Sequence, residues 1–296
     1  MQFKSNMNLI VFANGDRGYL LCKELTKKNY IVKAIITNRK KFKFFKEKIN
    51  HISIYVIDDI NEKKSVGFLS GFKADIFLVA GFSQIFQKQI LNIPKLATIN
   101  LHAGKLPYYR GGSPLNWQLI NQEKFAGISA ILMNEGIDTG NILAEKKFKI
   151  EEKDDILSLH SKANKLFPLI AIKAIKKISE GNLGKIQDKS KACYWCQRQD
   201  KDGEIIFQKL SAKEVHCIIR ALKSPYPYAW SEINSNKLRF MESVIPEIII
   251  KGTAGKILFL GGKGPYIICK DKAILITKYK SESDANFILK SNMYFS

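Results

Sequence analysis

Short apolar runs separated by polar, lysine-rich segments occupy the first third of the chain. Residues 8–13, 32–37, 52–57 and 76–80 are rich in Ile, Val and Leu, which is typical of strands buried on both faces. The intervening segments place apolar residues at helical spacing, as in residues 19–28. Strands that alternate with helices in this way predict a mainly parallel sheet with helices on both faces.

The turn after the first predicted strand contains Gly15 and Gly18. A dinucleotide-binding fingerprint would need the full Gly-x-Gly-x-x-Gly arrangement, which this turn lacks. We therefore expect no nicotinamide cofactor. Instead, Gly15 provides a permissive turn and Gly18 allows the following helix to pack closely.

The hydrophobic pattern changes near residue 190. Before it, we expect strands at 97–101 and 127–134, a helix at 115–121 and a long amphipathic helix at 156–180. After it come a short strand around Ile205 and Phe207, a helix at 212–222, and short strands divided by Gly and Asn at 230–233, 238–242, 255–260, 266–269 and 273–278. The sequence thus predicts an α/β, Rossmann-like domain at 1–190 and a smaller β-rich, OB-like domain at 191–296.

Charge and cysteine content restrict the possible classes of protein less than the hydrophobic pattern does. The chain has 48 basic and 27 acidic residues, a formal charge of +21, which attracts polyanions and leaves RNA binding open. The lysines are spread along the whole chain, which equally fits a compositional bias. Five cysteines without an export signal favour reduced thiols, and the lone pair Cys193 and Cys196 lacks the second ligand pair of a zinc site.

No apolar stretch approaches the ~20 residues that cross a bilayer, and the first eight residues are too polar for a signal peptide. We expect a cytoplasmic protein with no membrane partner.

Three polar residues, Asn100, His102 and Asp138, suit the attack of an amine on an acyl carbon. Asn100 and His102 are two positions apart, so on a strand their side chains share a face. The amide can face a developing oxyanion, the imidazole can take the proton of the amine, and the carboxylate can orient the imidazole. The alternatives are a structural His102 and an Asx turn at Asp138. His51, His160 and His216 have no convergent acid and are interpreted as structural.

The same residues carry a family resemblance. Asn100-Leu101-His102, Leu106-Pro107-x-x-Arg110-Gly111-x-x-Pro114 and Asp138-x-Gly140 together resemble the signature of the folate-dependent formyltransferases. The resemblance implies a Rossmann-like catalytic domain that transfers the formyl group of 10-formyltetrahydrofolate directly to an amine, without a metal. It assigns oxyanion stabilisation to Asn100, the general base to His102 and its orientation to Asp138.

The resemblance also implies the binding residues. Arg110 and Gly111 are expected to contact the substrate, Arg110 through a diphosphate. The pterin is expected in two loops, residues 82–86 and 134–138, which hold it largely through backbone groups. The expected contacts are Phe82, Ser83, Gln84, Ile85, Phe86, Asn134, Gly136 and Ile137.

The identity of the amine depends on finer features. The region from Tyr194 to Ala229 resembles the C-terminal part shared by methionyl-tRNA and sugar formyltransferases, so the likeness covers nearly the whole chain. The segment Pro114-Leu115-Asn116-Trp117 is similar to the nucleotide-sugar enzymes. Methionyl-tRNA enzymes carry a long basic insertion after the second strand, whereas residues 38–50 are short and predict an ordinary amphipathic helix.

We therefore predict an N-formyltransferase for a UDP- or dTDP-linked amino deoxy sugar in surface-glycan (lipopolysaccharide) biosynthesis. The main alternative is a methionyl-tRNA formyltransferase, with nucleic acid as partner. A non-catalytic binding protein is a third interpretation, and a homodimer is left open.

Overall fold

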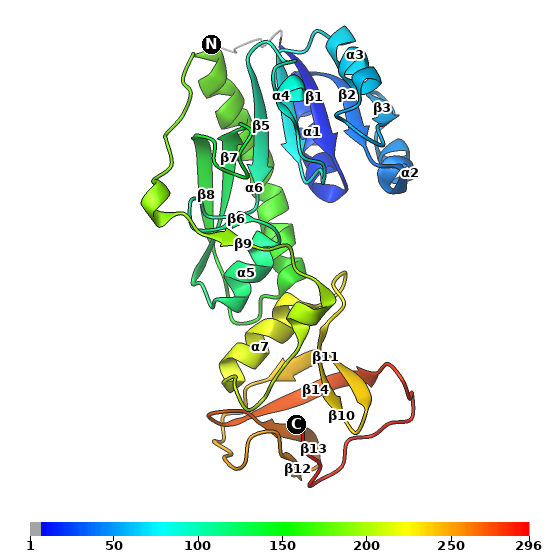
Figure 1. Cartoon of the computed structure of the whole chain (residues 1–296), viewed down its shortest axis with the longest axis vertical. Coiled ribbons are helices and arrows are strands. Elements are labelled where there is room, and N and C mark those ends of the chain that lie inside the picture. The colour runs from blue at the N-terminus through cyan, green and yellow to red at the C-terminus, as the bar shows by residue number, and fades with distance from the viewer. Residues whose placement is uncertain (1–6, 296) are drawn as a thin grey trace. The chain divides into compact units, whose positions relative to one another are not determined.

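The computed structural model describes residues 7–295, which form two compact units. Of the described residues, the first unit contains 7–111, 127–148 and 161–195. The second contains residues 112–126, 149–160 and 196–295. Figure 1 shows their elements in chain order.

A seven-stranded sheet organises the first unit, in the order β3-β2-β1-β4-β5-β7-β8. Its strands β1 to β5 pair in parallel, and β7 runs antiparallel to β5. The bounds are β1 Asn8–Ala13, β2 Ile31–Thr37, β3 Ser53–Val56, β4 Ile76–Ala80, β5 Ala97–His102, β7 Phe125–Leu132 and β8 Ile142–Lys149. The mainly parallel, Rossmann-like sheet expected from the sequence is confirmed, with β8 as an edge strand that the pattern did not predict.

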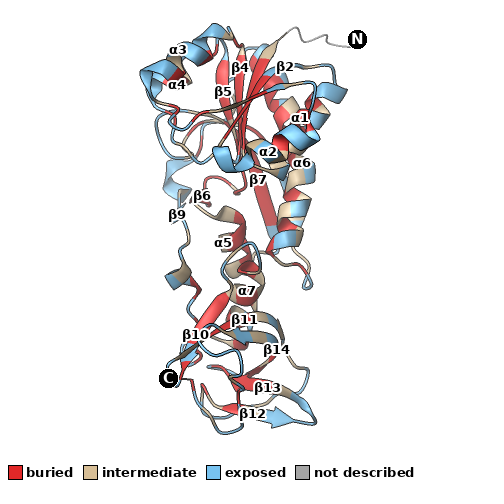
Figure 2. Ribbon diagram, turned by 90° about the vertical axis from the view of Figure 1, so that its right-hand side faces the viewer, coloured by how far each residue is buried: buried red, intermediate tan, exposed pale blue. Residues whose placement is uncertain are grey.

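Helices accompany this sheet, with their apolar sides turned to it. They are α1 Asp16–Lys27, α2 Arg39–Lys48, α3 Lys63–Gly71, α4 Lys88–Leu91 and α6 Ile156–Ser179. Figure 2 shows β4 and β5 almost entirely buried and α3 largely exposed. In α2 only Phe45 is buried, so the basic segment after the second strand is the amphipathic helix that was predicted.

Gly15 lies in the turn before α1, and Gly18 lies in the first turn of that helix. Gly15 has φ +98°, in the region that favours glycine. A Cβ on Gly18 would overlap with Ala13, so the helix approaches β1 closely only because that atom is missing. Both predicted roles are confirmed.

The second unit is β-rich, as expected. Its antiparallel sheet has the order β10-β11-β14-β13-β12, with β10 Ala229–Ile233, β11 Asn236–Val244, β12 Ile257–Leu260, β13 Lys263–Ile268 and β14 Ala273–Ser281. Two helices, α5 Pro114–Ile120 and α7 Ala212–Ala221, pack together, and the buried amide of Asn116 donates to the carbonyl of Ala221 at 2.7 Å.

The strand predicted around Ile205 and Phe207 was wrong. These residues follow the 3-10 helix η2 Asp200–Gly203, and only Glu204 forms a bridge, to Trp230. Both side chains are nevertheless fully buried in the core of the second unit. The alternation of apolar residues therefore predicted the burial of both side chains correctly. The backbone, however, pairs with a neighbouring strand at too few residues to form a strand itself.

None of the helices in residues 7–295 is both long and apolar enough to span a bilayer.

Candidate active site

The end of strand β5 carries Asn100 and His102, the two polar residues that were selected from the sequence. Asn100 is half-buried, and His102 is only 7% exposed. In the antiparallel pairing with β7, His102 lies opposite Ser129. The two alternating positions of β5 thus place the amide and the imidazole on one face of the sheet.

The hydrogen bonds of His102 indicate which of its two ring nitrogens is available to accept a proton. Its Nε2 lies 2.6 Å from the carbonyl oxygen of Tyr109, and because a carbonyl only accepts, Nε2 carries the proton of the neutral ring. The other nitrogen, Nδ1, lies 3.4 Å from Oδ1 of Asp138. Nδ1 is therefore the atom able to take a proton, and the resulting imidazolium would face a carboxylate.

Asp138 joins the other parts of the site. Its Oδ1 accepts a hydrogen bond from Nδ2 of Asn100 at 3.3 Å, and its Oδ2 accepts one from the backbone nitrogen of Gly111 at 2.9 Å. Its φ of +52° is uncommon for a residue other than glycine. Positions far apart in the sequence, Asn100, His102, Gly111 and Asp138, thus meet at one point, and strained backbone conformations of this kind are concentrated at functional sites.

Behind Asp138 lies Gln187, a residue that the sequence analysis did not select. Its buried side-chain nitrogen donates to the carbonyls of Asp138 at 2.8 Å and Gly140 at 2.7 Å. Its oxygen accepts from Nε and Nη2 of Arg110 at 3.1 and 2.9 Å. Gln187 belongs to an irregular segment between α6 and the 3-10 helix η1 Lys189–Lys191, where no local pattern would have identified it.

Arg110 lies inside the protein, only 4% exposed. Besides Gln187, its Nη1 donates to the hydroxyl of Tyr194 at 3.0 Å. Arg110 and Gly111 form the short strand β6, which pairs in parallel with β9, Tyr194–Trp195. The substrate contact expected of Arg110 stays a prediction. A substrate could bond only to those N–H groups of the guanidinium that do not already donate to Gln187 or Tyr194.

The first loop expected to hold the pterin, residues 82–86, follows β4. Phe82 and Phe86 pack edge-on against Phe12, and the half-buried Gln84 accepts from the backbone nitrogen of Ile60 at 2.7 Å. Ser83 and Ile85 are exposed, Ile85 by 71%. Three of the five side chains thus hold the loop in place, and two face solvent.

The second loop, residues 134–138, is closed by Asn134. Its side-chain oxygen accepts from the backbone nitrogen of Gly136 at 3.1 Å and the hydroxyl of Thr139 at 2.6 Å. Ile137 is 57% exposed. Met133, next to this loop, and Phe82 pack against the same hydrophobic cluster, so both loops border one part of the first unit.

Within residues 7–295, no three His, Cys, Asp or Glu side chains gather closely enough to hold a metal ion. The five cysteines are free thiols.

Comparison with known families assigns both parts of the chain. Residues 7–175 match the family described as formyl transferase, and residues 198–291 match the formyl transferase C-terminal domain. The chain is 35% identical, over 97% of its length, to the bifunctional polymyxin resistance protein ArnA of Wigglesworthia glossinidia brevipalpis, of which it spans 45%. It is 32% identical, over 77% of its length, to the methionyl-tRNA formyltransferase of Clostridium novyi, with 74% of that protein covered.

Solved structures share the fold. The crystal structure of WlaRD, a sugar 3N-formyl transferase, matches with a TM-score of 0.67 and 20% identity over 94% of this chain and 98% of that one. An N-formyltransferase from Helicobacter canadensis matches with a TM-score of 0.67 and 18% identity over 97% and 99%. Since the first family match alone covers more than half of the chain, and the second follows it in order, the protein belongs to the formyl transferase family.

Proposed function

We propose that the protein transfers the formyl group of 10-formyltetrahydrofolate to the amine of a nucleotide-linked amino deoxy sugar, in surface-glycan biosynthesis. The observation that carries the reaction is the meeting of Asn100, His102 and Asp138 within 3.3–3.4 Å. These groups supply a donor, a base and a carboxylate, which are what amine attack on a formyl carbon requires.

The roles follow from the atoms that are available. One N–H of the Asn100 amide donates to Asp138, and the other can donate to the formyl oxygen as that oxygen gains negative charge. Such a hydrogen bond stabilises the transition state by about 2.7–4 kcal/mol. Nδ1 of His102 accepts the proton that the attacking nitrogen releases as the new C–N bond forms. Asp138 stabilises the resulting imidazolium, and the proton then passes to the leaving nitrogen of the donor as the old C–N bond breaks.

The two loops at residues 82–86 and 134–138 fit a folate donor. When bound, 10-formyltetrahydrofolate supplies an activated formyl carbon. Exposed Ile85 and Ile137 offer apolar contact to a flat ring, and the irregular backbone around them offers hydrogen bonds to its polar edge. Gln84 and Asn134 keep the loops folded through the hydrogen bonds described above.

The sugar acceptor is supported by likeness rather than by a contact. WlaRD was crystallised with dTDP and 5-N-formyl-THF, and the Helicobacter canadensis enzyme with folinic acid and dTDP-3-aminofucose. In this chain the sugar-enzyme segment Pro114–Trp117 is engaged in packing: Asn116 is buried, and Nε1 of Trp117 donates to the carbonyl of Cys196 at 3.0 Å. It therefore supports the subfamily and identifies no substrate contact.

Methionyl-tRNA is the second candidate acceptor. It is favoured by the identity to methionyl-tRNA formyltransferases and by the charge of +21. Against it, the segment after β2 is a ten-residue helix, α2, whose Phe45 is buried in the first unit.

The acceptor is decided by a formyl-transfer assay with 10-formyltetrahydrofolate, in which a panel of UDP- and dTDP-linked amino sugars is compared with methionyl-tRNA. We expect turnover of one amino sugar and none of methionyl-tRNA. Turnover of methionyl-tRNA alone, with an affinity that falls steeply with salt, would replace the sugar by the tRNA.

A further inference from the structure

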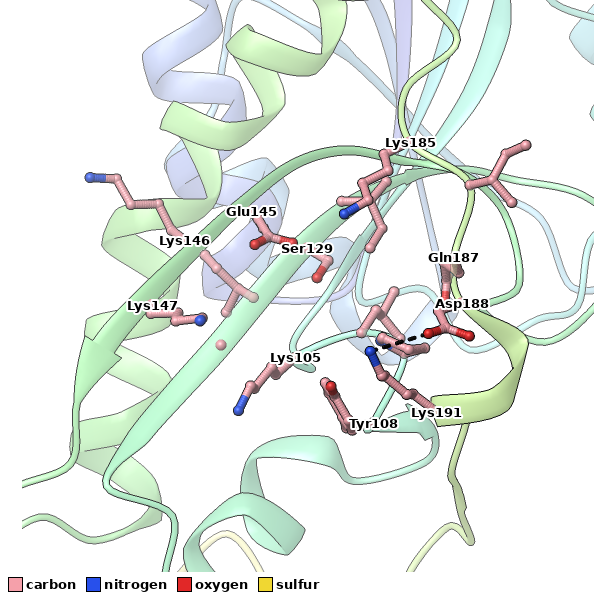
Figure 3. Close-up of a pocket in the computed structure, with 16 residues that line it drawn as sticks. Lys105, Tyr108, Ser129, Glu145, Lys146, Lys147, Lys185, Gln187, Asp188 and Lys191 are labelled. Carbon is pink, nitrogen blue, oxygen red and sulfur yellow. Dashed lines mark ion pairs between the residues drawn. The ribbon is translucent and has the colours of Figure 1, made fainter.

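Strand β5 loses one of its two neighbouring strands close to the residues of the site. On one side, β4 pairs with β5 only as far as Asn100. On the other side, β7 continues to the end of β5, where His102 lies opposite Ser129, which is labelled in Figure 3. In the strand pairing of the sheet, Leu101 and His102 are therefore held on one side only.

The side chain of Arg17 occupies the place of the missing strand. Its Nη1 donates to the carbonyl oxygen of the buried Leu101 at 3.2 Å. A Cβ on Gly81, the first residue after β4, would lie 3.7 Å from the same Nη1, so the guanidinium lies next to the end of that strand. A buried backbone carbonyl without a partner costs free energy, and here a side chain from 84 residues earlier supplies the donor.

Two helices hold the guanidinium in this position. Arg17 lies in the first turn of α1, and its Cζ lies 4.3 Å from the centre of the ring of Phe167 in α6. Phe167 is fully buried, and Figure 2 shows α1 and α6 on the same side of the sheet. A cation over the face of an aromatic ring is attracted by that ring. The two helices thus fix the guanidinium against the end of β5.

The carbonyl that Arg17 bonds belongs to the peptide group that joins Leu101 to His102. A shift of this peptide group moves the backbone of His102, and the imidazole moves with it. The Nδ1 of that ring lies 3.4 Å from Oδ1 of Asp138, a contact that a small displacement would lengthen. Misplacement of reacting groups by about 1 Å can lower a rate on the order of 10²-fold.

From these contacts we infer that Arg17 is a positioning residue for formyl transfer. It replaces the missing strand partner at the end of β5, and in this way it fixes the imidazole of His102 against Asp138. Arg17 acts through the backbone of Leu101, without a contact to donor or acceptor. The inference rests on the proposed roles of His102 and Asp138.

The test compares Arg17→Met and Arg17→Lys with the control Lys23→Met. Methionine keeps an apolar stem but removes the hydrogen bond and the charge, whereas lysine keeps a cation that can lie over Phe167 and donate to Leu101. Lys23 is exposed on the same helix, so its replacement removes the same charge from the surface. Circular dichroism and thermal unfolding verify that each variant is folded.

Two properties of each variant are measured. The first is kcat and KM for formyl transfer from 10-formyltetrahydrofolate to the amino sugar that the wild type turns over. The second is the NMR signal of the His102 ring, one of four histidines in the chain, which is identified by its absence in His102→Ala.

In Arg17→Met we expect kcat to fall roughly 10–10²-fold at nearly unchanged KM for donor and acceptor. The signal of His102 should shift, and that of the exposed His51 should not. Arg17→Lys should retain more activity than Arg17→Met, and Lys23→Met should match the wild type in both measurements.

Equal kcat in Arg17→Met and Lys23→Met would overturn the inference, and so would an unmoved His102 signal. A raised KM for the donor at unchanged kcat would also overturn it, because Arg17 would then contact the ligand. Failure of the proposed function has a different result. In that case the wild type formylates no amino sugar, or His102→Ala keeps full turnover, while the His102 signal still shifts in Arg17→Met.

Discussion

The side-chain nitrogen of Gln187 lies 2.8 Å from the carbonyl oxygen of Asp138, 49 residues earlier in the sequence. The same nitrogen holds the carbonyl of Gly140, and the amide oxygen holds the guanidinium of Arg110. One buried amide thus holds the segment that presents the carboxylate to His102. The conformation of that segment, with a positive φ at Asp138, depends on these bonds.

Gln187→Met keeps the size of the side chain and removes its hydrogen bonds. We expect kcat to fall on the order of 10²-fold, because a displaced carboxylate misaligns the imidazole, while KM for the acceptor changes little. Leaving Nε and Nη2 of Arg110 without their acceptor should also lower the free energy of unfolding by about 1–3 kcal/mol. Steady-state kinetics and denaturant unfolding measure both effects.

The matched control for this variant is Gln89→Met. The Gln89 amide also donates to a backbone carbonyl, that of Asn61 at 2.7 Å, but it is exposed. Equal kinetics of the two variants would show that Gln187 does not position the site.

Asp138→Asn tests the charge of the carboxylate with little change of shape. Without it, the imidazolium at Nδ1 of His102, 3.4 Å away, loses its counter-charge, so kcat/KM should fall about 10²–10⁴-fold. The neighbouring exposed Glu135 provides the control: Glu135→Gln should leave kcat/KM unchanged, and a similar loss in both variants would contradict the assigned role.

Gly140→Ala should disrupt the same segment from the backbone side. A Cβ at this position would overlap with the carbonyl of Leu132, and because that group is backbone it cannot move away alone. We expect the free energy of unfolding to fall by about 1–3 kcal/mol, together with loss of activity. At Gly67, in exposed α3, a Cβ meets nothing within 4 Å. Gly67→Ala should therefore be neutral or stabilising by about 0.5–1 kcal/mol, and equal effects at both positions would refute the steric argument.

The second unit should be sensitive to mild acid. Burial, followed by the nearby cations Arg220 and Lys223, lowers the pKa of His216 from 6.5 to about 4. Between these two pH values the unfolded chain binds a proton that the folded chain does not, so stability decreases as the pH falls from about 6.5 to about 4. The loss is at most about 3 kcal/mol.

His216→Asn should reduce this pH dependence, because asparagine does not titrate and can still bond to Ser243, which now meets the ring at 2.8 Å. Denaturant unfolding between pH 7.5 and 4 makes the comparison. His51→Asn, at an exposed position, should keep the wild-type slope. An unchanged slope in His216→Asn would remove His216 as the cause.

Local pattern was enough to predict most of the sheet and the shared strand of Asn100 and His102, whose catalytic roles stay predictions. Asn100 and His102 stand two apart on an apolar strand, so their common face follows from strand geometry alone. The role of Gly18 in close helix packing was predicted from the few residues around it. The strand β8 was missed because its sequence, with Glu145, Lys146 and Lys147 in succession, lacks the apolar alternation of a half-buried strand.

The features that the sequence could not show depend on contacts between residues that lie far apart in the chain. Arg110 has the charge of a phosphate ligand, but its burial depends on Gln187, 77 residues later. Gln187 itself lies in a segment without regular structure. Similarly, Ile205 and Phe207 alternate like a strand, yet burial without a partner strand produces the same pattern.

The most direct measurement of the central claim is formyl transfer from 10-formyltetrahydrofolate to amino sugars by the wild type, His102→Ala and the exposed control His51→Ala, with folding of each confirmed by circular dichroism. The account predicts turnover by the wild type and the control, and a loss of about 10²–10⁴-fold in His102→Ala. Undiminished turnover in His102→Ala would contradict the assignment of its Nδ1 as the base.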